Sequence, residues 1–214
     1  SDPSRGLGDV YKRQALGRAE DSVEEARRSV KQSDGLDTSD MEMRLEQAAA
    51  ALASGNASQA IGLADGVVRT LERERAAMDD VLRALKQKKK LTKRFEHRDD
   101  RADWETMLAD IVKAADDKTW SHAGMLLEQM TAALDREGHA VEEAQELYDF
   151  VTEQWAVLRN QCEAANIKAT DEDRRACEEA VALAGEHLEV ARLEAALEAL
   201  GVADGAMERL RRRI

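Results

Sequence analysis

The sequence contains one proline among 214 residues, and aromatic residues make up only 3% of it. Strands favour aromatic and β-branched residues, whereas this chain is rich in Ala, Leu, Glu and Arg. This composition excludes a substantial β-sheet. We therefore expect an all-α fold.

Long apolar runs and cysteines are also scarce. No run of eighteen apolar residues occurs, which argues against a membrane-spanning helix. Cys162 and Cys177 are the only cysteines, and they form neither a Cys-x-x-Cys pair nor a Cys/His metal spacing. We expect two small buried residues in a reducing cytoplasm, with an accidental approach across a hairpin as the alternative.

Catalytic and cofactor-binding motifs are missing too. There is no Glu-x-x-His pair for a carboxylate metal site, no phosphate-binding loop and no Gly-x-Ser-x-Gly elbow. The formal net charge of −12 argues against nucleic acid and anionic membranes as partners, because the surface repels phosphate. The sequence thus favours a non-enzymatic protein without a cofactor, a metal or a small-molecule substrate.

What the sequence does contain is an internal repeat. Eight residues recur 63 residues later, and this offset equals nine heptads, so the 3.5-residue helical pattern stays in phase. The pairs are Leu45/Leu108, Ser58/Ser121, Ala60/Ala123, Leu63/Leu126, Leu71/Leu134, Arg73/Arg136, Glu74/Glu137 and Ala77/Ala140. We expect an antiparallel helical repeat array, or a coiled-coil-like bundle, in which short and long helices alternate.

The chain divides into five segments on this reading. Residues 9–14 resemble the translated end of a transposase adapter, so we expect residues 1–14 to be a non-native segment or a disordered N-terminus. Residues 15–36 are the tail helix of a preceding repeat. Repeat 1 covers 37–98, repeat 2 covers 99–168, and a divergent or truncated repeat 3 covers 169–214.

Turn and cap signals place the helices inside the repeats. Ser39 and Glu42 form a capping box that opens a short helix. Gly55 and Asn56 end it. Asn56, with Gln59, is expected to cap the long helix that follows and continues to about Phe95. In repeat 2 the turn falls at Lys118-Thr119, and the long helix covers about 120–166.

Repeat 3 matches best at an offset near 68. Thr170 and Asp173 are its expected cap, and its turn is expected near Gly185-Glu186. Gly201 and Gly205 are expected to interrupt the last helix.

Residues 50–64, with a helix end of small residues, Gly55, and then Ala and aliphatic residues, resemble the turn region of tetratricopeptide-type helical repeats. Residues 114–127 and 182–195 repeat the pattern more faintly. The resemblance implies a scaffold that binds peptides or proteins along a helical surface. The period of 63 differs from the 34 residues of that family.

The end of the first long helix carries a basic cluster. One interpretation is a solvated helix end whose charges match the helix dipole. The other is a docking patch for an acidic partner, or for RNA with Phe95 stacking on a base. The candidate residues are Lys86, Lys88, Lys89, Lys90, Lys93, Arg94 and Phe95.

Glu74 and Glu137 occupy equivalent positions in the apolar seam of the two long helices. Either the seam is loose there and the carboxylates reach water, or each is a polar residue that sets the register of helix packing. The loose-seam interpretation predicts that Glu137→Leu raises the melting temperature.

Three functions remain open at this stage. The first is a scaffold for protein–protein interaction or self-association, the second a mechanical or spacer segment of a larger protein, and the third an enzyme or regulator with an unrecognised site. Only the first of these functions predicts that a partner binds to an exposed helix seam.

Overall fold

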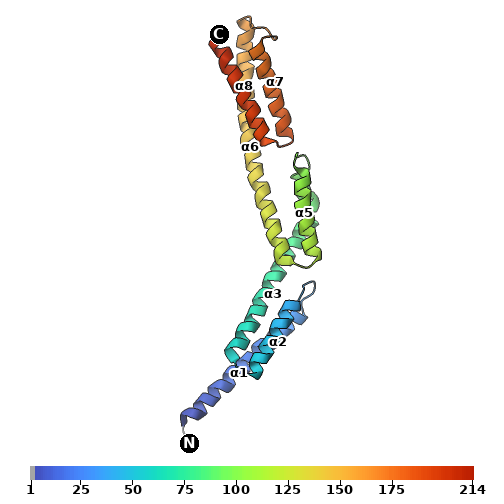
Figure 1. Cartoon of the computed structure of the whole chain (residues 1–214), viewed down its shortest axis with the longest axis vertical. Coiled ribbons are helices and arrows are strands. Elements are labelled where there is room, and N and C mark those ends of the chain that lie inside the picture. The colour runs from blue at the N-terminus through green and yellow to red at the C-terminus, as the bar shows by residue number, and fades with distance from the viewer. Residues whose placement is uncertain (1–2) are drawn as a thin grey trace. The chain divides into compact units, whose positions relative to one another are not determined.

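The computed structural model describes residues 3–214, with side chains from Arg5 onward, and this range is all-α, with eight helices and no strand (Figure 1). The expected fold class is therefore confirmed. The helices are α1 (Pro3–Lys31), α2 (Ser39–Ala53), α3 (Ala57–Lys86), α4 (Lys88–Lys93), α5 (Arg101–Asp116), α6 (Trp120–Ala164), α7 (Glu172–Glu189) and α8 (Leu193–Arg213).

The chain forms two compact units, and we describe each by itself. Unit 1 comprises residues 1–86 and 109–127, and unit 2 comprises residues 87–108 and 128–214. The division between the units passes through α5 and α6.

In unit 1, α1, α2 and α3 pack on one another along their apolar faces. Their buried residues recur at steps of three and four, which places them on one face of each helix. These residues are Ala19, Val23, Ala26 and Val30 in α1, Met41, Leu45, Ala48 and Ala51 in α2, and Ala60, Ala64, Val67, Leu71 and Val81 in α3.

In unit 2, the second half of α6 packs with α7 and α8 around one apolar core. Trp155 is 3% exposed and Met207 is fully buried, and both belong to this core. The free thiols of Cys162 and Cys177 are buried there as well, as small apolar side chains. A second small cluster joins Ala144, Leu188 and Ala196.

Three corners between successive helices share one set of backbone hydrogen bonds. They lie between α2 and α3, between α5 and α6, and between α7 and α8. Each has a residue of positive φ: Gly55 (76°), Lys118 (58°) and Ala191 (57°). The N–H of that residue bonds to the carbonyl three residues back, and the next N–H bonds to the carbonyl five residues back. This pair of bonds is the Schellman motif, which ends a helix with backbone groups alone.

A fourth corner, at Asn166 (φ 59°) between α6 and α7, has the same pair of bonds, but only the first three corners correspond in burial, position by position. Five residues after the residue of positive φ stands a fully buried alanine, which is Ala60, Ala123 or Ala196. Seven residues before it stands another fully buried residue. The first two corners are 63 residues apart, as the sequence indicates, but Lys118 and Ala191 are 73 residues apart.

The expected turn at Gly185-Glu186 is therefore wrong, because α7 continues through it to Glu189. Gly185 has a packing role instead. A Cβ atom there would lie 3.0 Å from the Tyr148 hydroxyl oxygen. Gly201 and Gly205 do not interrupt α8 either, because α8 is continuous from Leu193 to Arg213.

Other helix ends also differ from expectation. The first long helix does not reach Phe95, because Gln87, with φ −103° and ψ 26°, separates α3 from α4. The expected capping box of Ser39 is not formed, since Asp37 accepts hydrogen bonds from the Ser39 N–H and hydroxyl. Asp171, and not Thr170, caps α7.

Two further expectations concern the N-terminal half of the chain, and the structure confirms one of them. The cap of α3 by Asn56 is confirmed, because its side-chain oxygen accepts the Gln59 N–H at 3.1 Å. Residues 3–14, expected to be non-native or disordered, belong to α1, and the side chains from Arg5 to Gln14 are exposed. Their origin stays a prediction.

Candidate protein-binding surface

The basic cluster is divided by the break at Gln87. Lys86 ends α3 in unit 1, whereas Lys88, Lys89, Lys90 and Lys93 belong to α4 in unit 2. All five lysines are exposed, as a docking patch requires. The four lysines of α4 remain a candidate docking patch.

Phe95 and Arg94 do not fit the docking interpretation. Phe95 is fully buried and stacks on Trp104, with ring centroids 6.3 Å apart, so it cannot stack on a base. Arg94 donates a hydrogen bond of 2.6 Å to Asp135 on α6. The expectation that Phe95 takes part in binding is therefore wrong, because the aromatic ring fills the core beside α5.

Glu137 has a defined partner in the structure. It accepts a hydrogen bond of 3.2 Å from Arg98, which is 8% exposed and also binds Asp100 at 2.8 Å. The Arg98 guanidinium lies 5.7 Å from the centroid of the Trp104 ring. Its hydrogen bond to Asp100 is the main reason why the pKa of Arg98 is raised. Glu137 thus helps to satisfy a nearly buried cation, while its own side chain is 43% exposed and also reaches water.

Glu74 sits in a different environment. It accepts a hydrogen bond from the hydroxyl of Ser121, at the start of α6. Both residues line a shallow cleft of about 320 Å³ in unit 1, together with Asp37, Asp40, Met41, Arg44, Thr70, Lys118, Thr119 and His122. The cleft contains both acidic and basic side chains, so its charge favours neither an anionic nor a cationic ligand.

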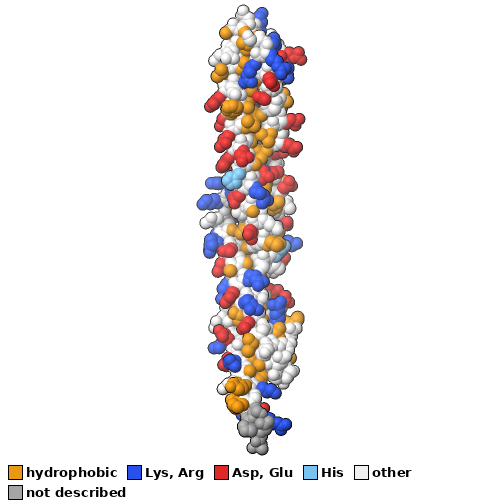
Figure 2. All heavy atoms as spheres, turned by 90° about the vertical axis from the view of Figure 1, so that its left-hand side faces the viewer, with side chains coloured by type: hydrophobic (Ala, Val, Ile, Leu, Met, Phe, Trp, Pro, Cys, Tyr) orange, Lys and Arg blue, Asp and Glu red, His pale blue; other side chains and the backbone are white. Residues whose placement is uncertain are grey.

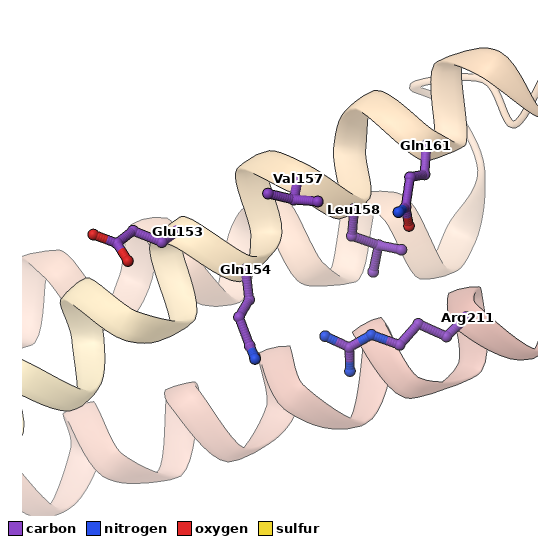
Figure 3. Close-up of a pocket in the computed structure, with 6 residues that line it drawn as sticks. All are labelled: Glu153, Gln154, Val157, Leu158, Gln161 and Arg211. Carbon is purple, nitrogen blue, oxygen red and sulfur yellow. The ribbon is translucent and has the colours of Figure 1, made fainter.

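A groove in unit 2 lies between α6 and α8 (Figure 3). Its volume is about 340 Å³, and it is lined by Glu153, Gln154, Val157, Leu158, Gln161 and Arg211. Gln154 and Leu158 point from α6 toward α8, and the Arg211 side chain extends back from α8. We call this the α6–α8 groove.

An exposed apolar stripe continues from the groove along α6. It consists of Leu147, Phe150 and Val157, which are 42%, 55% and 59% exposed. Their spacings of three and seven residues put them on one face of the helix. On α8, Leu197 (47% exposed) lies on the face of Arg211, two heptads before it.

The parts of α6 and α8 beside the stripe are rich in acidic residues, whereas the one α8 residue that lines the groove itself is Arg211. Between Arg136 and Arg159, α6 contains six acidic residues and no Lys or Arg, and between Arg192 and Arg209, α8 contains four acidic residues and no Lys or Arg. In the part of Figure 2 that shows the C-terminal helices, hydrophobic side chains form a strip with acidic side chains on both sides. Apolar area and negative charge therefore occur together on this surface.

Sequence reasoning missed this surface. The heptad pattern of α6 includes buried residues such as Leu134, Trp155 and Leu158, but also the exposed Ala165. It left Leu147, Phe150 and Val157 off the seam without a role. A second signal was available: three large apolar residues in register on the outer face, within a segment that has no basic residue.

The described residues hold no cluster of three or more His, Cys, Asp or Glu side chains suited to a metal. None of the described helices is long and apolar enough to cross a membrane. No protein-family model, no curated protein and no solved structure matches this chain.

Proposed function

We propose that this chain is a non-enzymatic helical-repeat scaffold that mediates protein–protein interaction or self-association. The observation that carries the proposal is the apolar stripe Leu147, Phe150 and Val157, which is exposed beside the α6–α8 groove. Large apolar side chains gathered on one face, with polar residues around them, are typical of interaction surfaces.

Repetition of the corner supports the scaffold part of the proposal. The same backbone bonds and the same buried positions occur at Gly55, Lys118 and Ala191. Repeats of this kind bury a core between neighbouring helices and leave the outer helix faces free for partners. Tetratricopeptide-type repeats use their helical surfaces in this way, and the resemblance of residues 50–64 extends the idea to this chain.

Two measurements test the proposal. Light scattering over a wide concentration range detects self-association, and chemical cross-linking in an extract of the source organism detects a discrete partner. We expect at least one positive result, and we expect Phe150→Ser or another exposed apolar replacement to abolish it. A chain that stays monomeric and gives no discrete cross-linked product would favour the spacer function.

A further inference from the structure

We propose that the α6–α8 groove, with the stripe Leu147, Phe150 and Val157, binds a basic amphipathic helix of a partner protein. This inference rests on the proposed scaffold function and names the site and the chemistry of the partner. Three observations carry it: the exposure of the stripe, its helical spacing and the charge of its borders.

The apolar part of the site fits a helix. From Leu147 to Gln161 the surface extends about 21 Å along α6, at 1.5 Å per residue, which accommodates roughly four turns of a docked helix. Apolar side chains on the partner at steps of three and four would meet Phe150 and Val157 and fill the groove beside them. Leu197 supplies apolar surface on the α8 wall.

The charge of the site selects the partner. On α6, Glu146 and Glu153 flank the stripe and are exposed, and on α8, Asp204 and Glu208 are exposed on the side of Arg211. No Lys or Arg lies in either segment before Arg159 or Arg209 to neutralise these carboxylates. An acidic helix would be repelled by these carboxylates, whereas Lys and Arg beside the apolar face of a docked helix would pair with them. Because Arg211 lines the groove near Leu158 and Gln161, the basic side chains of the partner would lie toward Leu147.

A second copy of this chain fits less well. Its α4 contains only six residues, and Leu91, the one large apolar side chain there, is partly buried. The start of α1 comes closer, because exposed Leu7, Val10 and Tyr11 lie on the same segment as Arg5, Lys12 and Arg13. Its exposed residues 5–14 extend only about 15 Å at 1.5 Å per residue, which is shorter than the site. The occupant that meets both demands is therefore a basic amphipathic helix from another protein.

The test uses the full chain and a synthetic helical peptide of about 18 residues. The peptide carries Leu at i, i+3, i+7 and i+10 and Lys at its other positions. Two control peptides keep the length: one replaces each Lys by Glu, and one has the same composition in an order without helical periodicity. Calorimetry measures the Kd of each.

We expect the Lys peptide to bind at least about tenfold more tightly than either control peptide. Phe150→Ser with Val157→Ser should weaken binding at least about tenfold, and Glu146→Lys with Glu153→Lys should do the same. All four side chains are exposed, so the variants keep the fold, and circular dichroism verifies this. Met43→Ser, which removes a 58% exposed apolar side chain of α2, is the matched control and should leave the Kd unchanged.

Equal binding of the aperiodic peptide, or full binding by the Phe150→Ser/Val157→Ser variant, would overturn the assignment. Failure of this inference can be told apart from failure of the scaffold function. If the Lys peptide does not bind but association of the chain persists in that variant, the groove assignment falls and the scaffold stands. If neither association nor peptide binding occurs, both fall.

Discussion

The indole Nε1 of Trp120 donates a hydrogen bond of 2.8 Å to the carbonyl oxygen of Gly35. Trp120 is the first residue of α6, and Gly35 lies in the loop between α1 and α2. Gly35 has φ +82°, and a Cβ atom on it would lie 3.2 Å from the Met78 sulfur. The loop is thus held between α3 and the start of α6 within unit 1.

Trp120→Phe should destabilise the protein by about 1–2 kcal/mol, because the part-buried Gly35 carbonyl loses its donor while the aromatic volume is mostly kept. Urea denaturation followed by circular dichroism measures the change. An unchanged midpoint would mean that water replaces the indole at no cost.

Two glycine substitutions should act in opposite directions. Gly35→Ala should destabilise by about 1–2 kcal/mol, because alanine is strained at positive φ and its Cβ would crowd Met78. Gly201→Ala should stabilise by up to about 1 kcal/mol, because this position lies inside α8 with open space around it. Thermal unfolding of the two variants side by side tests the contrast, and a stabilised Gly35→Ala would contradict it.

Replacement of the two equivalent glutamates, Glu74 and Glu137, should change the stability of the protein in different ways. Glu137→Leu should lower stability by about 1 kcal/mol, because Arg98 is nearly buried and keeps only Asp100 as a charged partner. This reverses the sign that a loose seam predicts. Glu74→Leu removes only the bond from the exposed Ser121 hydroxyl and should be neutral or stabilising. Melting temperatures of both variants decide between the interpretations, and a higher value for Glu137→Leu would restore the loose seam.

The N-terminus of α7 should respond to acid. The hydrogen bond from Arg213 is the main cause that lowers the pKa of Asp171 from 3.8 to about 2. Because the folded pKa is the lower one, the ionised group stabilises the fold fully above about pH 4, and this contribution is lost as the pH falls to about 2.

Asp171→Asn keeps the capping oxygen and removes the charge, so it isolates this effect. We expect the variant to be less stable than the parent at pH 6, and the difference to disappear near pH 2. Urea midpoints at pH 6, 4, 3 and 2 give the profile. A constant difference at every pH would show that the charge pair with Arg213 is not its source.

The two thiols should be inert in the folded protein. Cys162 and Cys177 are fully buried, and desolvation is the main cause that raises the pKa of Cys177 to about 12 and also raises that of Cys162. The thiolate, which is the reactive form, is therefore almost absent at pH 8. Iodoacetamide should modify neither residue in buffer and both in concentrated urea, as mass spectrometry can show. Fast labelling of the native chain would contradict the burial.

The fold was predictable where helical periodicity dominates. Buried positions such as Val67, Met130 and Leu158 follow from the 3.5-residue pattern, because an amphipathic face must be covered. The third corner was not predictable from turn residues, because Ala191 carries no turn signal and Gly185 carries a misleading one. A glycine is needed at position 185 because a Cβ atom there would crowd the hydroxyl of Tyr148, a residue far away in the sequence.

The candidate site shows the same limit. A count of charges located the exposed lysines of α4, but it could not show that Phe95 turns inward onto Trp104. A count of charges also could not show that Glu137 binds Arg98, because this contact depends on how α6 packs against the segment before α5. Tertiary contacts decide which polar groups are satisfied, and local pattern does not report them.

The helix before each of the corners at Gly55, Lys118 and Ala191 ends in the same pair of main-chain hydrogen bonds. A helix end made in this way accommodates glycine, lysine and alanine at the residue of positive φ. A hairpin closed in this way can therefore change in charge and apolar surface without losing its shape. On the proposed scaffold function, duplication of such a hairpin would add a new binding face while the framework that presents it stays the same.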